Sequence, residues 1–363
     1  DLLGLLYATH QGKGFVRLLK DARIELRRVT WPTKQETVTT SWQVLAVVVV
    51  ASILLYDTNE NNVHSASEVS SKPIFIKNNI SEIVEQSDGI IICTPNHTHE
   101  MIIKEISTLK DIPIVCEKPL STNIDSAYRI CEVANKKSII SFNYRYNKLI
   151  EAIINIIGIY EFGKINYFYA SFNKDSALRR KHLTWRDTAD QNASSGALGD
   201  LSCHLIDLFT YISKQDVLYE SVRVSKGTAV KEKAGGLVSV DDNGYIFGVG
   251  VNGCIFKIKA SKVEKDEPKG LHLNLIFENG EIKYTPEKSN EINVKLFSSE
   301  NWINHGVLDE HLIPDPENEV SYWSDSFYSM LNEWCRLIKE NESFERLPLI
   351  SKGVNVQLIL ENI

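Results

Sequence analysis

Four short polar segments of this sequence hold residue types that can move a proton or bind a small ligand. Residues 94–99 read TPNHTH, residues 117–119 read EKP and residues 143–146 read NYRY, while Asp200 and His204 stand four apart. Burial or a neighbouring positive charge lowers the pKa of an ammonium group, so the lysine of EKP can act as a tuned proton donor. An imidazole beside a carboxylate also suits general acid–base work. These residue types therefore predict proton transfer on a small molecule.

The first three segments follow apolar runs of strand length that alternate with helical patterns. We expect helices at 80–86, 99–109 and 124–135, the second capped by Thr98, and strands at 74–76, 89–93, 112–116 and 138–142. This alternation predicts a doubly wound parallel sheet, and such sheets bind ligands at the carboxyl ends of their strands. All three segments should therefore open on one crevice.

Asp200 and His204 fall in SSGALGDLSCHLIDL, residues 194–208, which has a helical pattern. Residues four apart project from one face of an α-helix, so both side chains can reach a common site. A surface ion pair or a pair of metal ligands has the same spacing, and Lys118 is equally compatible with a solvated loop lysine. Cys203 has no second cysteine nearby, so we expect no metal site.

Overall composition narrows the class of protein. The 363 residues are 43% hydrophobic, enough for one large core and for two domains of ordinary size. The net charge of −7, without a basic tail, argues against a nucleic-acid binder. The six cysteines lie far apart with no C-x-x-C pair, which favours a reducing cytoplasm.

Residues 1–56 differ from the rest of the chain. They carry seven Lys and Arg against four Asp and Glu, a net charge of +3 that leaves −10 for the remaining residues. Residues 15–29 predict a basic amphipathic helix suited to an anionic membrane surface, and Trp31-Pro32 ends it. Residues 42–56 are almost wholly apolar but short for the roughly 20 residues that cross a bilayer. By pattern alone, a buried helix or a β-rich core segment fits them as well.

The stretch ARIELRRVTWPTKQETVTTSW, residues 22–42, resembles SecE, the small subunit of the bacterial protein-translocation channel, and the resemblance covers residues 13–55. It implies a surface helix, a Trp-Pro hinge and a membrane helix, with membrane or translocase contact through residues 13–56 and a tether to the inner membrane through residues 42–56. It also explains Gly12-Lys13-Gly14 better than a dinucleotide loop does, because Arg17 stands in place of the third glycine.

From residue 57 onward a second resemblance replaces the first. The segments 94–99, 117–119 and 142–146, together with 194–208, resemble the motifs of the Gfo/Idh/MocA oxidoreductases. The resemblance implies a cytoplasmic enzyme that transfers hydride between NAD(P) and a hydroxyl of a sugar, cyclitol or nucleotide sugar, without a metal. It assigns the hydroxyl proton to Lys118 and His204, and it gives Asp200 the binding of substrate and the orientation of the histidine.

The same resemblance implies a cofactor site and a substrate mouth. The residues along the cofactor would be Asp57, Thr94, Pro95, Asn96, His99, Glu117 and Asn143, and those at the substrate mouth Arg145, Trp185 and Arg186. Asp57 favours NAD over NADP, since a carboxylate repels a 2′-phosphate. Ser202 stands where the family has a glycine between the aspartate and the histidine, which adds bulk at a close helix contact.

The fold class implied is α/β: a truncated doubly wound, Rossmann-like sheet followed by an α+β domain with an open antiparallel sheet. We expect helices near 322–339 and 353–361, and strands at 164–173, 217–225, 244–250, 253–260, 271–278, 280–285 and 292–298. In the family the open face of this sheet joins subunits, so a homo-oligomer is implied. The domains would be residues 1–56, 57–146 and 147–363.

The first βαβ unit of the family, with its G-x-G-x-x-G loop, has no counterpart here. ILLYDTNEN, residues 53–61, matches only the end of the second strand, and residues 52–56 are apolar enough to act as that strand. Losing the backbone N–H groups that hold a pyrophosphate predicts weak NAD(H) binding or none. Three alternatives stay open: a membrane-anchored, non-catalytic sugar-binding protein, a translocase subunit with a passenger, and a joining error between two genes.

Overall fold

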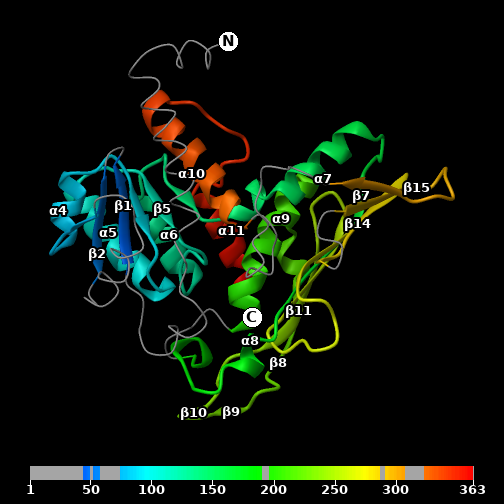
Figure 1. Ribbon diagram of the computed structural model, residues 1–363, viewed down its shortest axis with the longest axis horizontal. Coiled ribbons are helices and arrows are strands. Elements are labelled where there is room, and N and C mark those ends of the chain that lie inside the picture. The colour runs from blue at the N-terminus through cyan, green and yellow to red at the C-terminus, as the bar shows by residue number, and fades with distance from the viewer. Residues whose placement is uncertain are drawn as a thin grey trace.

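The computed structural model describes residues 44–49, 52–57, 74–189, 196–286, 291–306 and 323–362. Two sheets lie on either side of a group of central helices (Figure 1). The amphipathic helix and the Trp-Pro hinge predicted for residues 15–32 lie outside the described residues. Within the described part of the chain, no helix is both long and apolar enough to cross a membrane.

The first sheet has six strands in the order β3-β2-β1-β4-β5-β6. They are β1 (Val44–Val49), β2 (Ser52–Asp57), β3 (Ile74–Ile76), β4 (Ile90–Ile92), β5 (Ile114–Cys116) and β6 (Ile139–Ile140). Five of these strands are parallel, whereas β1 runs antiparallel to both of its neighbours, β2 and β4. The sheet is therefore mixed, and the prediction of a wholly parallel sheet is wrong.

β1 and β2 form a hairpin from residues predicted to be a hydrophobic helix, so that prediction is wrong for 44–49 and 52–57. Two residues separate the strands, and Val44 pairs with Asp57 at the open end. The segment VLAVVV is rich in β-branched residues, which favour strands. The backbone N–H and C=O groups of β4 and β3 form hydrogen bonds with the hairpin. A helix at this place would leave those groups unpaired. The prediction that residues 52–56 can act as a strand is confirmed.

Three helices accompany the first sheet, as predicted: α4 (Ile80–Glu85), α5 (His99–Leu109) and α6 (Ile124–Val133). Asn79 and Asn123 cap α4 and α6, because their side chains accept hydrogen bonds from backbone N–H groups of the first turn. Thr98 occupies the N-cap position of α5 but does not cap it. A 3₁₀ turn, η2 (Asn96–Thr98), precedes the helix, and the Thr98 hydroxyl donates to the Pro95 carbonyl oxygen instead.

The second sheet has eight strands in the order β16-β15-β14-β13-β7-β12-β11-β8. They are β7 (Ile165–Asn173), β8 (Arg223–Gly227), β11 (Asn243–Val249), β12 (Ile255–Ser261), β13 (Gly270–Phe277), β14 (Gly280–Tyr284), β15 (Glu291–Leu296) and β16 (Ile303–Gly306). The central pair β7 and β12 is parallel and the other pairs are antiparallel, so this sheet is also mixed, in contrast to the prediction. A separate ribbon is formed by β9 (Glu232–Lys233) and β10 (Gly236–Leu237).

Helices of the second half connect the two sheets. They are α7 (Lys148–Ile159), α8 (Ser176–Arg179), α9 (Cys203–Ser213), α10 (Trp323–Glu340) and α11 (Ser351–Leu360). Helix α9 packs on β7 and β12, and α11 packs on α6 and α9 (Figure 1). Met330 and Trp334 of α10 pack with Val115 and Ile139 of the first sheet. Helix α10, which belongs to the predicted domain 147–363, therefore packs on the sheet of the predicted domain 57–146.

Candidate active site

His99 holds together the loops that follow β4 and β5. One ring nitrogen lies 2.8 Å from the Thr94 carbonyl oxygen and the other 3.0 Å from the Leu120 carbonyl oxygen. The side chain is fully buried, and burial lowers the pKa of its imidazole. His99 therefore lies beneath the loops and positions Thr94, Pro95 and Asn96, rather than lining the crevice itself.

Glu117 and Asn143 lie at the ends of β5 and β6. The Glu117 carboxylate accepts hydrogen bonds from the Lys118 backbone N–H at 3.1 Å and the Ser141 hydroxyl at 3.0 Å, and burial raises its pKa. The Asn143 amide donates to the Ser326 hydroxyl of α10 at 2.7 Å, whereas its buried Oδ1 has no hydrogen-bond partner among the described residues. A buried acceptor without a donor costs free energy, so this oxygen is suited to receive a ligand N–H.

Lys118, Asp200 and Lys262 form a chain of ion pairs in the crevice. Lys118 Nζ lies 2.8 Å from one carboxylate oxygen of Asp200, and Lys262 Nζ lies 2.9 Å from the other. The Asp200 side chain stays 37% exposed, so the chain is open to a ligand on one side. Lys262 follows β12 and was not foreseen from the sequence.

The charges in this chain fix the protonation of its members. Burial alone would lower the pKa of Lys118, but the Asp200 carboxylate outweighs it and holds that pKa above its ordinary value. Burial would likewise raise the pKa of Asp200, which the two lysines hold well below its usual range. The expectation of a lysine with a lowered pKa is therefore wrong, because its nearest charged neighbour is negative. Lys118 is a fixed cation here.

His204 is the neutral member of the site. Burial, reinforced by the charge of Lys118, lowers the pKa of this imidazole well below its ordinary value. The ring stacks on Tyr144 with 4.1 Å between ring centroids and 6° between planes, and its buried Nδ1 has no hydrogen-bond partner in the described part of the chain. A neutral imidazole with a lone pair to spare is a proton acceptor.

The helix turn between Asp200 and His204 differs from the α-helix that the sequence predicts. Residues Leu198–Ser202 form a π-helical turn, η5, ahead of α9, and the buried Ser202 hydroxyl donates back to the Leu198 carbonyl oxygen. A π turn breaks the spacing that brings residues four apart together. Both oxygens of Asp200 bind lysines, so Asp200 is not hydrogen-bonded to the histidine that it was expected to orient.

Asp241 fixes the start of this turn. Its carboxylate accepts hydrogen bonds from the backbone N–H groups of Gly196 at 2.9 Å and Leu198 at 2.8 Å. Lys262 Nζ donates to the Gly196 carbonyl oxygen at 3.0 Å. A Cβ atom at Gly196 would lie 1.9 Å from the Asp241 carbonyl oxygen, so only glycine fits there. The second sheet therefore holds the segment that carries Asp200 at two points.

The three residues expected at the substrate mouth lie in two separate places. Arg145 is buried in a bidentate ion pair with Asp207, at 2.5 and 2.8 Å, and does not reach the crevice cluster. Trp185 and Arg186 belong to the 3₁₀ turn η4 (Trp185–Asp187), and Arg186 lines a pocket beside Lys262. In the described residues no cluster of His, Cys, Asp and Glu could hold a metal.

The crevice fits one half of a dinucleotide better than the other. The unpartnered Oδ1 of Asn143 can accept the N–H of a nicotinamide carboxamide, beside the proton acceptor His204. Asp57, at the end of β2, is buried at the same edge. Between β1 and β2, however, two residues replace the glycine loop and helix that cradle a pyrophosphate in dinucleotide-binding sheets. The hairpin leaves no such cradle at this connection.

The α/β fold is one that solved NAD-binding oxidoreductases share. The structure is similar to that of levoglucosan dehydrogenase in complex with NADH and levoglucosan, with a TM-score of 0.73. The two sequences are 21% identical over 85% of this chain and 86% of that one. An oxidoreductase domain protein from Kribbella flavida gives a TM-score of 0.74 at 19% identity, covering 86% of both chains. These similarities establish the fold.

Sequence similarity places the chain within a family. Residues 151–283 match the GFO/IDH/MocA C-terminal domain. Glucose-6-phosphate 3-dehydrogenase of Bacillus subtilis is 33% identical over 311 residues, which cover 85% of this chain and 86% of the relative. The chain belongs to the Gfo/Idh/MocA family.

The first residues have a different relationship. Residues 16–56 match the SecE/Sec61-gamma subunits of the protein translocation complex. The SecE subunit of Pseudomonas aeruginosa is 46% identical over 52 residues, 14% of this chain and 43% of that subunit. The chain is thus a fusion in which SecE-like residues supply β1 and nearly all of β2 in a sheet of the oxidoreductase fold.

Proposed function

We propose that this protein is an oxidoreductase that transfers a hydride between a hydroxyl group of a sugar and NAD(H). The observation that carries the proposal is the neutral, buried His204 beside the cation Lys118, which Asp200 holds in place. Relatives that act, by name, on glucose 6-phosphate and levoglucosan support a sugar substrate. Levoglucosan dehydrogenase complexes with NADH support NAD(H) as the cofactor.

The side chains divide the proton chemistry between them. Bound NAD⁺ would accept the hydride. His204, neutral near pH 7, accepts the hydroxyl proton through a ring nitrogen. The Lys118 ammonium group donates a hydrogen bond to the same oxygen and stabilises the negative charge that develops on it. Asp200 keeps Lys118 charged, and in the reverse direction the protonated His204 returns the proton.

The cofactor would lie along the ends of β2, β4, β5 and β6. Asn143 would bind the carboxamide of the nicotinamide, and Glu117 with residues 94–96 would border the ring. Asp57 would bind the adenosine ribose and select NAD, since its carboxylate repels a 2′-phosphate. Without a glycine loop between β1 and β2 we expect low affinity for the cofactor.

A homo-oligomer through the second sheet is part of the proposal. Phe247 of β11 and Ile255 of β12 are 38% and 54% exposed on the sheet, and Trp302 is 41% exposed just before β16. Exposed apolar side chains gathered on one surface are typical of subunit interfaces. Light scattering of the protein and of Ile255→Glu tests this assembly.

A membrane-anchored or translocase-bound protein is a second candidate, favoured by the SecE match over residues 16–56. It requires residues 44–57 to leave the first sheet, because the same backbone cannot pair with β3 and β4 and form a membrane helix. Carbonate extraction of membranes distinguishes the two: retention in the membrane pellet favours the anchor. Sequencing an independent clone across codons 50–60 tests whether the fusion is a joining error.

NADH titration and turnover of glucose 6-phosphate with NAD⁺ test the oxidoreductase. We expect nicotinamide fluorescence to change on binding, and NADH to form at a rate that Lys118→Met lowers strongly. The matched control is Lys104→Met, which removes an exposed lysine from α5. Absence of NADH formation in both proteins and with other sugars would contradict the proposal.

A further inference from the structure

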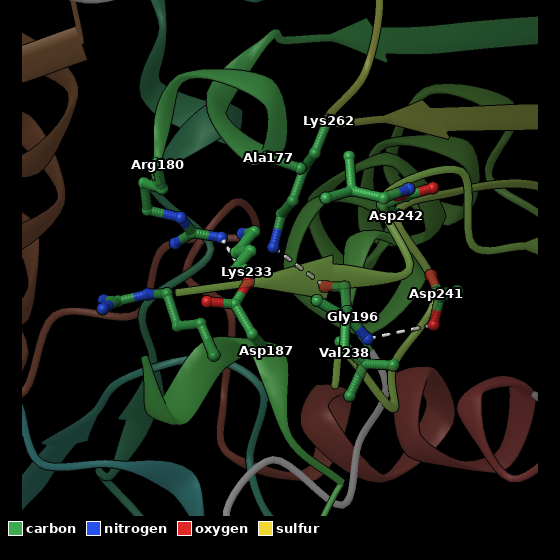
Figure 2. Close-up of a pocket in the computed structure, with 12 residues that line it drawn as sticks. Ala177, Arg180, Asp187, Gly196, Lys233, Val238, Asp241, Asp242 and Lys262 are labelled. Carbon is green, nitrogen blue, oxygen red and sulfur yellow. Dashed lines mark hydrogen bonds and ion pairs between the residues drawn. The ribbon is translucent and has the colours of Figure 1, made fainter. Parts of the chain in front are cut away.

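The Arg145–Asp207 ion pair lies between two segments that carry residues of the candidate site. Its side chains are 4% and 2% exposed, and it joins the 3₁₀ turn η3 (Asn143–Tyr146), which follows β6, to α9. Lys233 and Asp187 form an equally buried pair, at 2.7 Å, in the pocket at η4 (Figure 2), but that pair joins η4 to the β9–β10 ribbon. The first pair therefore connects the loop after β6 with the helix of the proton acceptor.

One face of α9 is turned toward η3. His204, Asp207 and Tyr211 stand three and four residues apart, so they lie on the same side of the helix. The His204 ring stacks on Tyr144. The guanidinium group of Arg145 binds Asp207 through two N–H groups and lies 5.0 Å from the centre of the Tyr211 ring. Two adjacent residues of η3 thus hold two successive turns of α9.

Packing alone does not require a buried ion pair at this contact. Removing two charges from water costs free energy, and apolar side chains of similar volume often stabilise a core as well or better. Apolar contacts, however, have no preferred direction. A bidentate pair of arginine and carboxylate fixes both the distance and the angle between the segments that carry it. Such a pair is suited to a contact whose geometry matters for the neighbouring side chains.

We propose that Arg145 and Asp207 are positioning residues for hydride transfer, which hold the Tyr144 ring against the imidazole of His204. The stacked ring keeps the imidazole oriented and shielded from water. Because Asn143 lies on the same turn, the pair also fixes the nicotinamide carboxamide relative to the proton acceptor. A misplacement of roughly 1 Å can cost about a hundredfold in rate. The inference rests on the proposed function for the reaction and deepens it by naming residues that act without touching the substrate.

The charge of the His204 ring tests this positioning without any substrate. Burial, together with the charges of Lys118 and Lys174, lowers the pKa of the imidazole, and Asp200 opposes them. We therefore expect the ring to stay neutral between pH 8 and 5. Nuclear magnetic resonance titration of the full chain with labelled histidine measures it, and His204→Asn assigns the signal.

The test variant is Arg145→Met with Asp207→Leu, which replaces the ion pair by apolar side chains. We expect a folded protein in which water reaches the loosened ring, so that the pKa of the ring rises toward its ordinary value and the ring titrates between pH 8 and 5. Turnover of glucose 6-phosphate with NAD⁺ should fall about tenfold or more, while the KM for glucose 6-phosphate changes less than about threefold. Arg145→Lys keeps the charge but loses the paired donors, so it should shift both measurements less, in the same direction.

The matched control is Lys233→Met, which breaks the equally buried pair with Asp187 on the β9–β10 ribbon. It should leave the His204 ring neutral. A folded double variant whose ring stays neutral at pH 5 would overturn the proposal, and so would a control that shifts the ring as far as the double variant does. If circular dichroism shows that the double variant is unfolded, the same criteria apply to Arg145→Lys.

The outcome is separable from that of the proposed reaction. The titration of the ring needs neither cofactor nor sugar, so a chain that forms no NADH refutes the proposed function while a shifted ring still supports the positioning of His204. A chain that forms NADH, with variants that keep both its rate and its neutral ring, supports the proposed function and refutes the positioning pair.

Discussion

The two halves of the ligand edge of the first sheet are built differently. At the ends of β4, β5 and β6, hydrogen bonds link each loop to the next, through His99 and through Glu117 with Ser141. At β1 and β2, a hairpin fills the two strand positions, and its two-residue connection joins Val49 and Ser52 at the opposite, amino edge of the sheet. A strand position accepts any suitably apolar, β-branched segment. A binding loop depends on one particular backbone path, so a borrowed sequence can supply a strand without supplying such a loop.

We expect the largest effect on cofactor binding from replacing β1 and β2, the half of the ligand edge that the hairpin forms. Grafting a strand, glycine loop, helix and strand of the dinucleotide-binding type in place of residues 1–57 should lower the NADH dissociation constant by about a thousandfold. Several backbone N–H groups would then bind the pyrophosphate, each contributing about 1.5 kcal/mol or more. Nicotinamide fluorescence measures the affinity. A graft that folds but binds no better than the parent would show that the halves do not differ in cofactor binding.

The next largest effect is on turnover and concerns the other half of the ligand edge, at the ends of β4, β5 and β6. In the grafted protein, His204→Asn should reduce turnover about a hundredfold or more, because it removes the proton acceptor. Initial rates of NADH formation measure it. Cys254→Ala, in the turn between β11 and β12, is the control and should leave the rate nearly unchanged. A normal rate in His204→Asn would remove the catalytic role from this half.

A smaller effect, on the free energy of unfolding, tests whether the hairpin is as well packed as the neighbouring strands. Leu54 of β2 and Ile92 of β4 are both buried in one core. We expect Leu54→Ala and Ile92→Ala each to lower the free energy of unfolding by about 2 kcal/mol or more. Urea denaturation measures both, with the exposed Leu109→Ala of α5 as control. A cost well under 1 kcal/mol for Leu54 alone would mean that the hairpin packs poorly.

The smallest effect concerns pH. His99 and His204 have pKa values lowered by burial, whereas the described residues of the hairpin include no histidine. The unfolded chain therefore binds more protons below pH 6.5, and each histidine should remove up to about 1.4 kcal/mol of stability per pH unit as the pH falls below that value. Above it their contribution is complete. Urea midpoints between pH 8 and 5 measure this, and His204→Asn should flatten the profile.

Local patterns predicted much of the fold. The helix at 99–109 and the strands around the second sheet follow from periodicity and turn residues. The parallel pairing of β7 with β12 did not, because turn signals describe only neighbours in sequence. The membrane helix that the SecE resemblance implied is wrong for residues 44–49 and 52–56, because their apolar run fits strands as well as a helix and the sheet positions beside β4 and β3 decided between them.

The candidate site was predicted less completely. Motifs predicted that Lys118 and His204 share one crevice, and in the structure the charge of Lys118 acts on His204. The charge state of Lys118 depended on Asp200, 82 residues further along. No sequence motif marked Lys262 as a site residue, since a single lysine after a strand is common. Arg145 was expected at the substrate mouth, and its burial with Asp207 is a tertiary contact that no local pattern shows.

The direction of β1 also decides at which edge of the first sheet the preceding chain joins it. A parallel first strand would begin at the amino edge of the sheet, but β1 begins at the carboxyl edge, opposite Asp57. Six strand residues span roughly 20 Å, so the reversal moves the junction with residue 43 by about that distance. A segment fused directly to Val44 would therefore join the sheet on the crevice side.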